Sequence, residues 1–253
     1  MIGEGTVEDM VTVTIRGERK QFEQGTSFEA IAEKYQAECG GLIAVAAANG
    51  KIRELFKKVT KDCQVDFFTL GDAVGYKTYV RTATMLFIKA VHDLFGAETA
   101  QNTRVEFTIG HGHYISSEGR IPATDENAAK IRDHMRRLVE EKIPFKKRSY
   151  PLEEAMELFR AHGMKDKEKL FRYRMSSSVN IYEIQGYYDY YYGYMLPHTG
   201  YVKWFDVIAY DEGFMMLLPT QKEPTVVKPF REQKKLFQTM KISTEWGKKI
   251  GIE

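Results

Sequence analysis

Two histidines separated by one residue, His111 and His113, form the pattern that comes nearest to a metal site. Residues i and i+2 of a β-strand project to the same side, so the two imidazoles could share one ion. A zinc site, however, needs three or four protein ligands. The sequence therefore predicts no bound metal and favours a polar pocket that the two histidines form together with Arg81 and His198.

Tyrosine is unusually frequent, with 15 residues, several of them crowded between residues 182 and 201. Their rings could stack on nucleic-acid bases while neighbouring cations bind phosphates. The candidate RNA contacts are Lys146, Lys147, Arg148, Arg172 and Arg174. Tyrosine is also a good strand former, so the sequence favours packing of these rings in a sheet and keeps a ligand role, first of all for Tyr194, as the alternative. The serines at 176–178 have no nearby base that could activate a hydroxyl.

Gly50 and Lys51 do not complete a phosphate-binding loop. That motif needs another glycine five residues before Gly50 and a hydroxyl residue after the lysine, but Val45 and Ile52 occupy these positions. Without a glycine-rich turn there is no cradle of backbone N–H groups for phosphate. We expect no nucleotide site at this point of the chain and no cofactor in this segment.

Length and composition indicate two ordinary globular domains. The chain has 253 residues, of which 43% are hydrophobic and 28% charged, and its net charge is only +2. This total does not call for a nucleic-acid or membrane partner. Two cysteines are too few for a disulfide framework, and residues 1–10 lack the apolar core of a signal peptide. We expect a cytoplasmic protein without membrane segments.

The first part of the chain predicts a small β-grasp domain at residues 10–72, preceded by an extension at 1–9. A hairpin is expected from strands at 11–15 and 20–23, followed by a helix at 28–35 that Thr26 or Ser27 caps. A buried strand at 42–48 enters the Asn49-Gly50 turn, and a strand at 63–69 closes the unit. These features resemble the TGS domain, which implies binding of RNA or of a regulatory ligand. A packing module without a ligand is the alternative.

A second domain is expected at residues 76–220. It opens with a long helix at 77–95, continues with paired strands at 104–109 and 113–116, and contains helices at 124–141 and 151–162. This order resembles the second N-terminal domain of threonyl-tRNA synthetase, which alanyl-tRNA synthetase and freestanding editing proteins share. The expected fold class is therefore α+β, a TGS-like β-grasp domain followed by a larger editing-like α+β domain.

The resemblance also directs attention to four positions. Editing members carry two histidines one helical turn apart and a Cys-x-x-x-His pair around their pocket. Here these positions hold Arg81, Met85, Tyr194 and His198. One remaining ligand cannot hold zinc, so the resemblance implies a degenerate editing site without a catalytic residue. The candidate pocket residues are Arg81, Met85, His111, His113, Tyr194 and His198.

Residues 221–253 are expected to form a helical linker, with a basic amphipathic helix at 230–240 and a short continuation at 245–250. The stretch 244–252 resembles the joint at which bacterial nucleoside kinases pass into a uridine-kinase-like P-loop domain. This resemblance implies that the chain is a non-catalytic region of such a kinase, which either regulates it or binds RNA, tRNA or a nucleotide. ATP and magnesium are expected only in the attached kinase domain. The alternatives are a divergent editing domain that hydrolyses mischarged aminoacyl-tRNA and a purely structural or dimerising region; self-association is compatible with all three.

Overall fold

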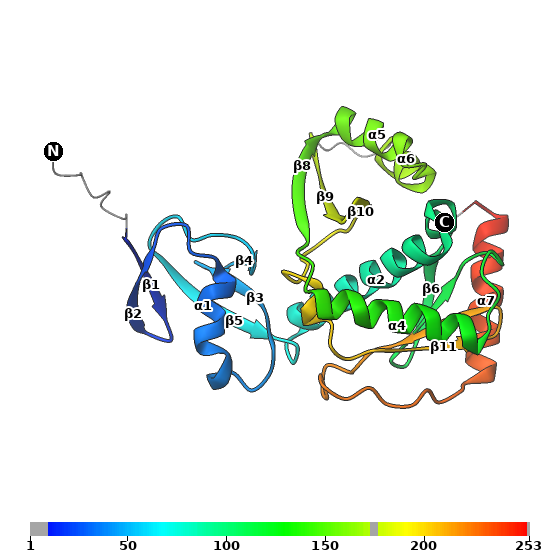
Figure 1. Ribbon diagram of the computed structural model, residues 1–253, viewed down its shortest axis with the longest axis horizontal. Helices are drawn as coiled ribbons and strands as arrows, with labels where there is room; N and C mark the ends of the chain where they lie inside the picture. Colours follow the sequence, from blue (N-terminus) through cyan, green and yellow to red (C-terminus); the bar gives the residue numbers. More distant parts are fainter. Residues whose placement is uncertain (1–9, 173–176, 252–253) are drawn as a thin grey trace. The chain divides into compact units, whose positions relative to one another are not determined.

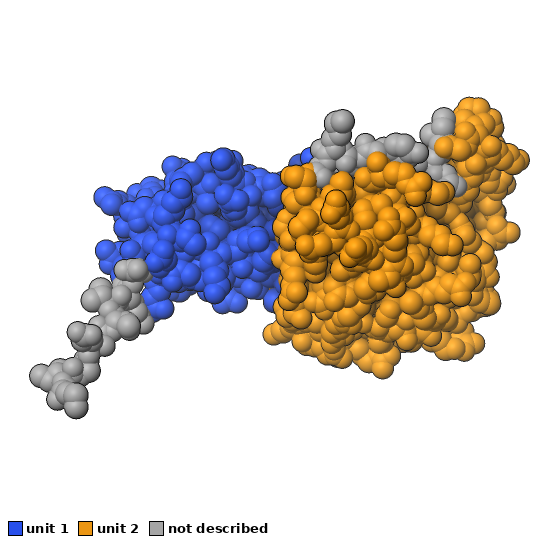
Figure 2. Space-filling model, turned by 90° about the horizontal axis from the view of Figure 1, so that it is seen from above, with its two compact units in different colours: residues 1–82, 192–198 blue, residues 83–191, 199–253 orange. Residues whose placement is uncertain are grey.

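The residues that the structure describes form three separate β-sheets (Figure 1). The computed structural model describes residues 10–172 and 177–251, and it divides into two compact units that Figure 2 distinguishes by colour. Unit 1 comprises Met1–Thr82 and Tyr192–His198, and unit 2 comprises Ala83–Tyr191 and Thr199–Glu253. The mixed composition of helices and several sheets is consistent with the α+β class that the sequence predicts. The expected extension at 1–9 lies outside the described residues.

Unit 1 is built on a five-stranded sheet with strand order β2-β1-β5-β3-β4. Strands β1 and β5 run parallel, and the other neighbouring strands are antiparallel. The elements of this unit before the long helix are β1 (Met10–Ile15), β2 (Glu18–Glu23), α1 (Phe28–Tyr35), a 3-10 turn (Gln36–Glu38), β3 (Ile43–Ala48), β4 (Lys51–Glu54) and β5 (Cys63–Thr69). The predicted order of hairpin, helix, strand, turn and strand is confirmed.

Helix α1 forms because its apolar residues recur at helical spacing behind a polar cap. Ser27, and not Thr26, is the cap: its Oγ accepts a hydrogen bond from the backbone N–H of Ala30 at 3.1 Å. The buried Tyr35 side chain meets Phe67 of β5, with ring centroids 5.9 Å apart. The helix thus packs its apolar side against the sheet (Figure 1).

The long helix α2 (Ala73–Phe95) begins in unit 1 and ends in unit 2. It starts four residues before the predicted position at residue 77. The reason is Gly75: a Cβ atom there would lie 2.0 Å from the Thr69 carbonyl oxygen, so only glycine lets the first helical turn approach β5 this closely. From the sequence alone, Gly75 is expected to belong to a connector and not to the helix.

Unit 2 contains a four-stranded antiparallel sheet, order β11-β12-β7-β6, and a three-stranded antiparallel sheet, order β10-β9-β8. Its remaining elements are α3 (Ala97–Gln101), β6 (Arg104–Ile109), β7 (Gly112–Ser116), α4 (Asp125–Glu141), β8 (Lys146–Pro151), α5 (Leu152–Ala161), α6 (Lys165–Arg172), β9 (Ser178–Ile184), β10 (Tyr187–Tyr190), a 3-10 turn (Thr199–Tyr201), β11 (Asp206–Tyr210), β12 (Gly213–Leu217) and α7 (Lys234–Lys249). The helix predicted at 151–162 begins one residue later, because Pro151 ends β8 and serves as the N-cap of α5.

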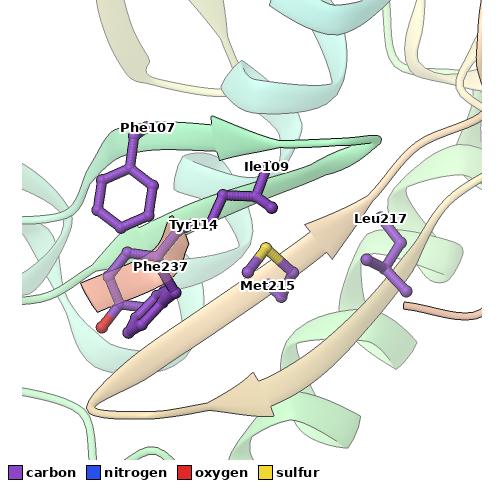
Figure 3. Packing of buried hydrophobic residues seen from close by; sticks show 6 residues of the cluster. All are labelled: Phe107, Ile109, Tyr114, Met215, Leu217 and Phe237. Carbon is purple, nitrogen blue, oxygen red and sulfur yellow. The ribbon is translucent and has the colours of Figure 1, made fainter. Parts of the chain in front are cut away.

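Helices cover both faces of the four-stranded sheet. Neighbouring residues of a strand point to opposite faces, and on β12 the Phe214 ring contacts Phe87 of α2 at 6.4 Å. Met215 points the other way, into a cluster with Phe237 of α7. Figure 3 shows this cluster, which consists of Phe107, Ile109, Tyr114, Met215, Leu217 and Phe237.

Helix α7 differs from the linker that the sequence suggests for 221–253. It is one continuous helix from Lys234 to Lys249, whereas the sequence indicates a helix at 230–240 and a separate continuation. Only 4% of the Phe237 surface is exposed, because the ring packs against the sheet. The amphipathic pattern in the sequence shows that this helix has an apolar side, but it does not show that this side packs against a sheet of the same unit.

Candidate functional site

The Arg81 guanidinium lies against the loop at residues 192–198, within unit 1. Its Nη1 donates a hydrogen bond to the Tyr194 carbonyl oxygen at 3.3 Å. Gly193 has a φ of +132°, and a Cβ atom there would lie 2.5 Å from the Arg81 Cζ. Glycine therefore meets two requirements at this position, the backbone angle and the space for the guanidinium. The loop thus holds the Arg81 guanidinium, which occupies the first of the four positions that correspond to the ligands of editing members.

Two polar side chains from distant parts of the chain fix the backbone of this loop. Glu54, at the end of β4, is only 2% exposed, and its Oε1 accepts a hydrogen bond from Met195 N at 3.3 Å. Thr82 Oγ1 accepts from Leu196 N at 3.0 Å and donates to the Thr78 carbonyl at 2.8 Å. Buried polar groups that are paired in this way favour one loop conformation.

His198, at the end of the same loop, faces a carboxylate. Its Nε2 lies 3.3 Å from Glu29 Oε1, and the two side chains are 24% and 23% exposed. The imidazole and the carboxylate thus form a pair that solvent can reach. Such a pair can bind a polar ligand or orient the imidazole for proton transfer.

The chemistry of this donor set does not suit a metal. Arg81 is cationic and has no lone pair to donate, and the Tyr194 contact comes from a backbone carbonyl. Within residues 10–172 and 177–251, no three histidine, cysteine, aspartate or glutamate side chains come together as a metal-binding group. The arrangement can attract anions through Arg81 and make hydrogen bonds through the His198–Glu29 pair.

The other predicted pocket residues belong to unit 2. Met85 is a fully buried residue of α2. His111 lies in the turn before β7, and its Nε2 is 2.8 Å from the Lys228 carbonyl oxygen. His113 lies on β7, and its Nδ1 is 3.0 Å from Thr108 Oγ1. The prediction that the two histidines alternate on one strand is therefore wrong: His111 precedes β7, and each histidine has its own partner.

His113 is a buried imidazole with one unsatisfied nitrogen. The residue is 9% exposed, and its Nε2 has no hydrogen-bond partner within the described residues. Burial, reinforced by the nearby positive charge of His111 when that ring is protonated, lowers the pKa of His113 to about 4. The ring is thus neutral near pH 7, which suits a packed position on β7.

The predicted RNA contacts do not share one face. Lys146 and Arg148 are exposed on β8, where Lys146 Nζ pairs with Glu183 Oε2 at 3.2 Å. Lys147 points to the other side and lies over the Tyr182 ring, 5.1 Å from its centroid. Arg172 is exposed on α6, with its Nη2 3.7 Å from Glu168 Oε1. Arg174, and Ser176 of the serine group, lie outside the described residues.

Several tyrosines of the 182–201 region pack inside unit 2. The Tyr188 ring lies tilted against His162, with centroids 4.8 Å apart, and Tyr190 meets Phe171 edge to face at 4.7 Å. Tyr187 is buried and donates its hydroxyl to Asp189 Oδ2 at 3.2 Å, and burial together with this carboxylate raises the Tyr187 pKa well above its usual value. These contacts explain the tyrosine frequency by packing. Tyr192, by contrast, is 79% exposed.

Sequence reasoning did not find Glu29, Glu54, Thr82 or Gly193. None belongs to a motif, and each is drawn to the site by a contact with a residue far away in the chain. A local signal exists only for Gly193, a glycine inside a run of tyrosines that indicates a special backbone angle. The three polar residues become recognisable only once the chain has folded.

Comparison with known proteins supports the synthetase resemblance. The chain is similar to threonine–tRNA ligases. It is 29% identical to that of Thermotoga maritima over 76% of its own length and 29% of the ligase. The corresponding values are 23%, 79% and 31% for the ligase of Acetivibrio thermocellus, and 26%, 78% and 30% for that of Caldanaerobacter subterraneus subsp. tengcongensis.

The chain thus spans less than a third of the length of these ligases. The resemblance to threonyl-tRNA synthetases is confirmed at this level, whereas none of the three relatives is named as a kinase. No protein-family model matches the chain. Among the helices described, none has both the length and the hydropathy for crossing a bilayer.

Proposed function

We propose that this chain is a tRNA-binding region of a protein related to threonyl-tRNA synthetase. In this proposal unit 1 contains a TGS-like β-grasp module, and the Arg81 site receives the acceptor end of tRNA without a metal. The observation that carries the proposal is the Arg81 guanidinium held by Gly193 and Tyr194. It supports anion binding at a position where the resembled editing sites have a histidine.

The charges around Arg81 suit an RNA end better than a metal ion. A guanidinium offers several N–H donors in one plane and stays charged at all relevant pH values, so it binds phosphate oxygens well. The His198–Glu29 pair can form hydrogen bonds with ribose hydroxyl groups, because it has both donors and acceptors. The fixed loop backbone keeps these groups in position before the ligand arrives.

Replacing Arg81 with methionine is expected to weaken tRNA binding about tenfold, because one charge-assisted contact is lost while the side-chain length is retained. Binding should be measured by fluorescence anisotropy with labelled tRNA between 50 and about 200 mM salt. The slope of log affinity against log salt should also fall by about one unit for one lost phosphate contact. Arg81→Lys should retain part of the affinity and most of the salt slope.

Two further variants distinguish tRNA binding at the Arg81 site from a general effect of the net charge of the protein. Gly193→Ala should weaken binding as Arg81→Met does, since a Cβ atom at this position collides with the guanidinium. Arg136→Met removes one charge from an exposed position of α4 and should leave the affinity within about twofold. Equal losses in Arg81→Met and Arg136→Met would contradict a dedicated site.

A second candidate function is hydrolysis of mischarged aminoacyl-tRNA, and the His198–Glu29 pair is the observation in its favour. In this case His198 accepts a proton from the attacking water, and Glu29 orients the imidazole. If the chain hydrolyses such a substrate, His198→Gln should lower the rate about 100-fold and Glu29→Gln by a smaller factor. The measurement is deacylation of purified mischarged tRNA.

His162→Gln provides the control for this assay, because His162 lies in unit 2 at the end of α5 and hydrogen-bonds the Leu158 carbonyl. It should leave the rate unchanged. A wild-type chain that binds the tRNA but leaves it aminoacylated over hours would eliminate the hydrolytic candidate and favour binding alone.

The attached uridine-kinase-like P-loop domain stays a prediction that rests on residues 244–252 alone. We propose that, if such a domain follows, binding of tRNA to this region regulates that domain. A full-length gene product whose sequence continues with Gly-Lys-Ser or Gly-Lys-Thr in a glycine-rich loop would support this context. A synthetase core would instead assign the chain to a ligase.

A further inference from the structure

A basic cavity of about 350 Å³ lies in unit 1 and shares no residue with the Arg81 site. Its volume falls in the range of pockets for small ligands. Five cationic residues contribute to its lining: Lys51, Arg53, Lys57, Lys58 and Lys61. The lining residues in the described part of the chain include no carboxylate. The cavity therefore concentrates positive charge.

Strand β4 supplies two of these cations. It is the edge strand of the five-stranded sheet, and Lys51 and Arg53 alternate along it, so both project to the same side. Both residues are exposed. An edge strand has a neighbour on one side only, which leaves these long side chains free of crowding from a further strand.

The segment that carries the other three cations is held by the entry to helix α1. Val59 exchanges backbone hydrogen bonds with this entry: its N–H donates to Thr26 O at 2.8 Å, and its carbonyl accepts from Gly25 N at 2.7 Å. The Lys57 carbonyl accepts from Phe28 N at 2.9 Å. The wall of the cavity is thus fixed before a ligand binds, which reduces the entropy lost on binding.

Within the described residues, nearby carboxylates hydrogen-bond to other groups and do not pair with the cations of the cavity. None of the five cations forms an ion pair with a residue in 10–172 or 177–251. Asp62 accepts a hydrogen bond from Thr12 N at 2.8 Å, and the buried Glu54 accepts from Met195 N. Burial raises the pKa of the Cys63 thiol, so this lining residue adds no negative charge at neutral pH.

We infer that the cavity binds the phosphate chain of a phosphorylated ligand that carries at least two negative charges. Lysine and arginine side chains provide the donors here. The first N–H groups of α1 are already used, since Phe28 N, Glu29 N and Ala30 N donate within the protein. This distinguishes the site from a phosphate-binding loop, in which backbone N–H groups surround the phosphate. A free nucleotide and a terminal phosphate of RNA share this chemistry.

The test is calorimetric titration of the whole chain with tripolyphosphate at about 50 mM salt, where phosphate contacts are strongest. Saturable binding at one site is expected. The double variant Lys51→Met, Arg53→Met should bind at least about tenfold more weakly. Lys58→Met with Lys61→Met should give a similar loss, and circular dichroism should show native content of helix and strand for at least one of the two.

The matched control is Arg19→Met with Lys34→Met, which removes the same charges from exposed positions of unit 1 outside the cavity. It should bind tripolyphosphate as the wild type does. The inference is overturned if the wild type fails to bind, or if the control loses as much affinity as the cavity variants. Competition by ATP and by a 5′-phosphorylated RNA 12-mer then distinguishes the two sources, and displacement by either one supports the site.

This experiment is independent of the proposed function. Loss of tRNA binding in Arg81→Met with normal tripolyphosphate binding would support both sites separately. Failure of tripolyphosphate binding would overturn the cavity and leave the Arg81 proposal standing.

Discussion

Replacing Phe237 with alanine is expected to lower the free energy of unfolding of unit 2 by about 3 to 5 kcal/mol. The ring is 4% exposed and lies at the centre of an aromatic group, with centroids 5.5 Å from Phe107, 4.9 Å from Tyr114 and 4.8 Å from Tyr210. The substitution removes these contacts and leaves a cavity between α7 and the sheet. Urea unfolding followed by circular dichroism measures the change.

Leu236→Ala is the matched control, because Leu236 is the preceding residue of α7 and is 43% exposed. Its expected effect is within about 0.5 kcal/mol. If both substitutions had the same small effect, α7 would be a loosely attached linker, as the sequence suggests, and the packing in Figure 3 would contribute little to stability.

Unit 2 is expected to lose stability as the pH falls from about 6.5 to about 4, and His113 accounts for about 3 kcal/mol of this loss. Burial lowers the pKa of His113 to about 4 in the folded protein, against about 6.5 in an unfolded chain. Between these values the unfolded chain binds a proton that the folded protein does not. The contribution is therefore fully present above about pH 6.5 and is lost as the pH approaches 4. Urea titrations at several pH values measure it.

Two variants separate titration of His113 from its packing. His113→Asn removes the titrating group, so the slope of stability against pH in this window should flatten by up to about 1.4 kcal/mol per pH unit. Thr108→Val removes the hydroxyl beside His113 Nδ1 but keeps the imidazole, so it should lower stability while the slope persists. An unchanged slope in His113→Asn would assign the acid sensitivity to other groups.

Local patterns predict the elements of unit 1 well. The alternation of Val11, Val13 and Ile15 and the helical spacing at 28–35 depend on neighbours in the sequence, and both elements are found. The start of α2 and the position of α7 depend on tertiary contacts. Gly75 is a helical residue because the first turn of α2 can approach β5 there, and the role of Phe237 depends on strands at least 20 residues distant in the chain.

The candidate sites show the same division. Arg81, Tyr194 and His198 come from a resemblance, and the structure brings these three into unit 1 with Gly193 and with Glu29, which no local pattern reveals. The cations between Lys51 and Lys61 are visible in the sequence, but a strand and a loop must fold before they line one cavity. Spacing can therefore suggest which charges are present, whereas their convergence is a property of the folded chain.

The loop at residues 192–198 has a consequence for the order in which the protein acquires its structure during synthesis. Leu196 N donates to Thr82 Oγ1 although the two residues are 114 positions apart. A ribosome therefore releases almost all of unit 1 before it makes the segment that pairs with Glu54 and Thr82. Until then Glu54 and Thr82 lack the backbone N–H groups of Met195 and Leu196, and a long intervening chain must be closed into a loop before these two hydrogen bonds form. Fragments that end before residue 192 should consequently be poor substitutes for the intact chain in binding studies.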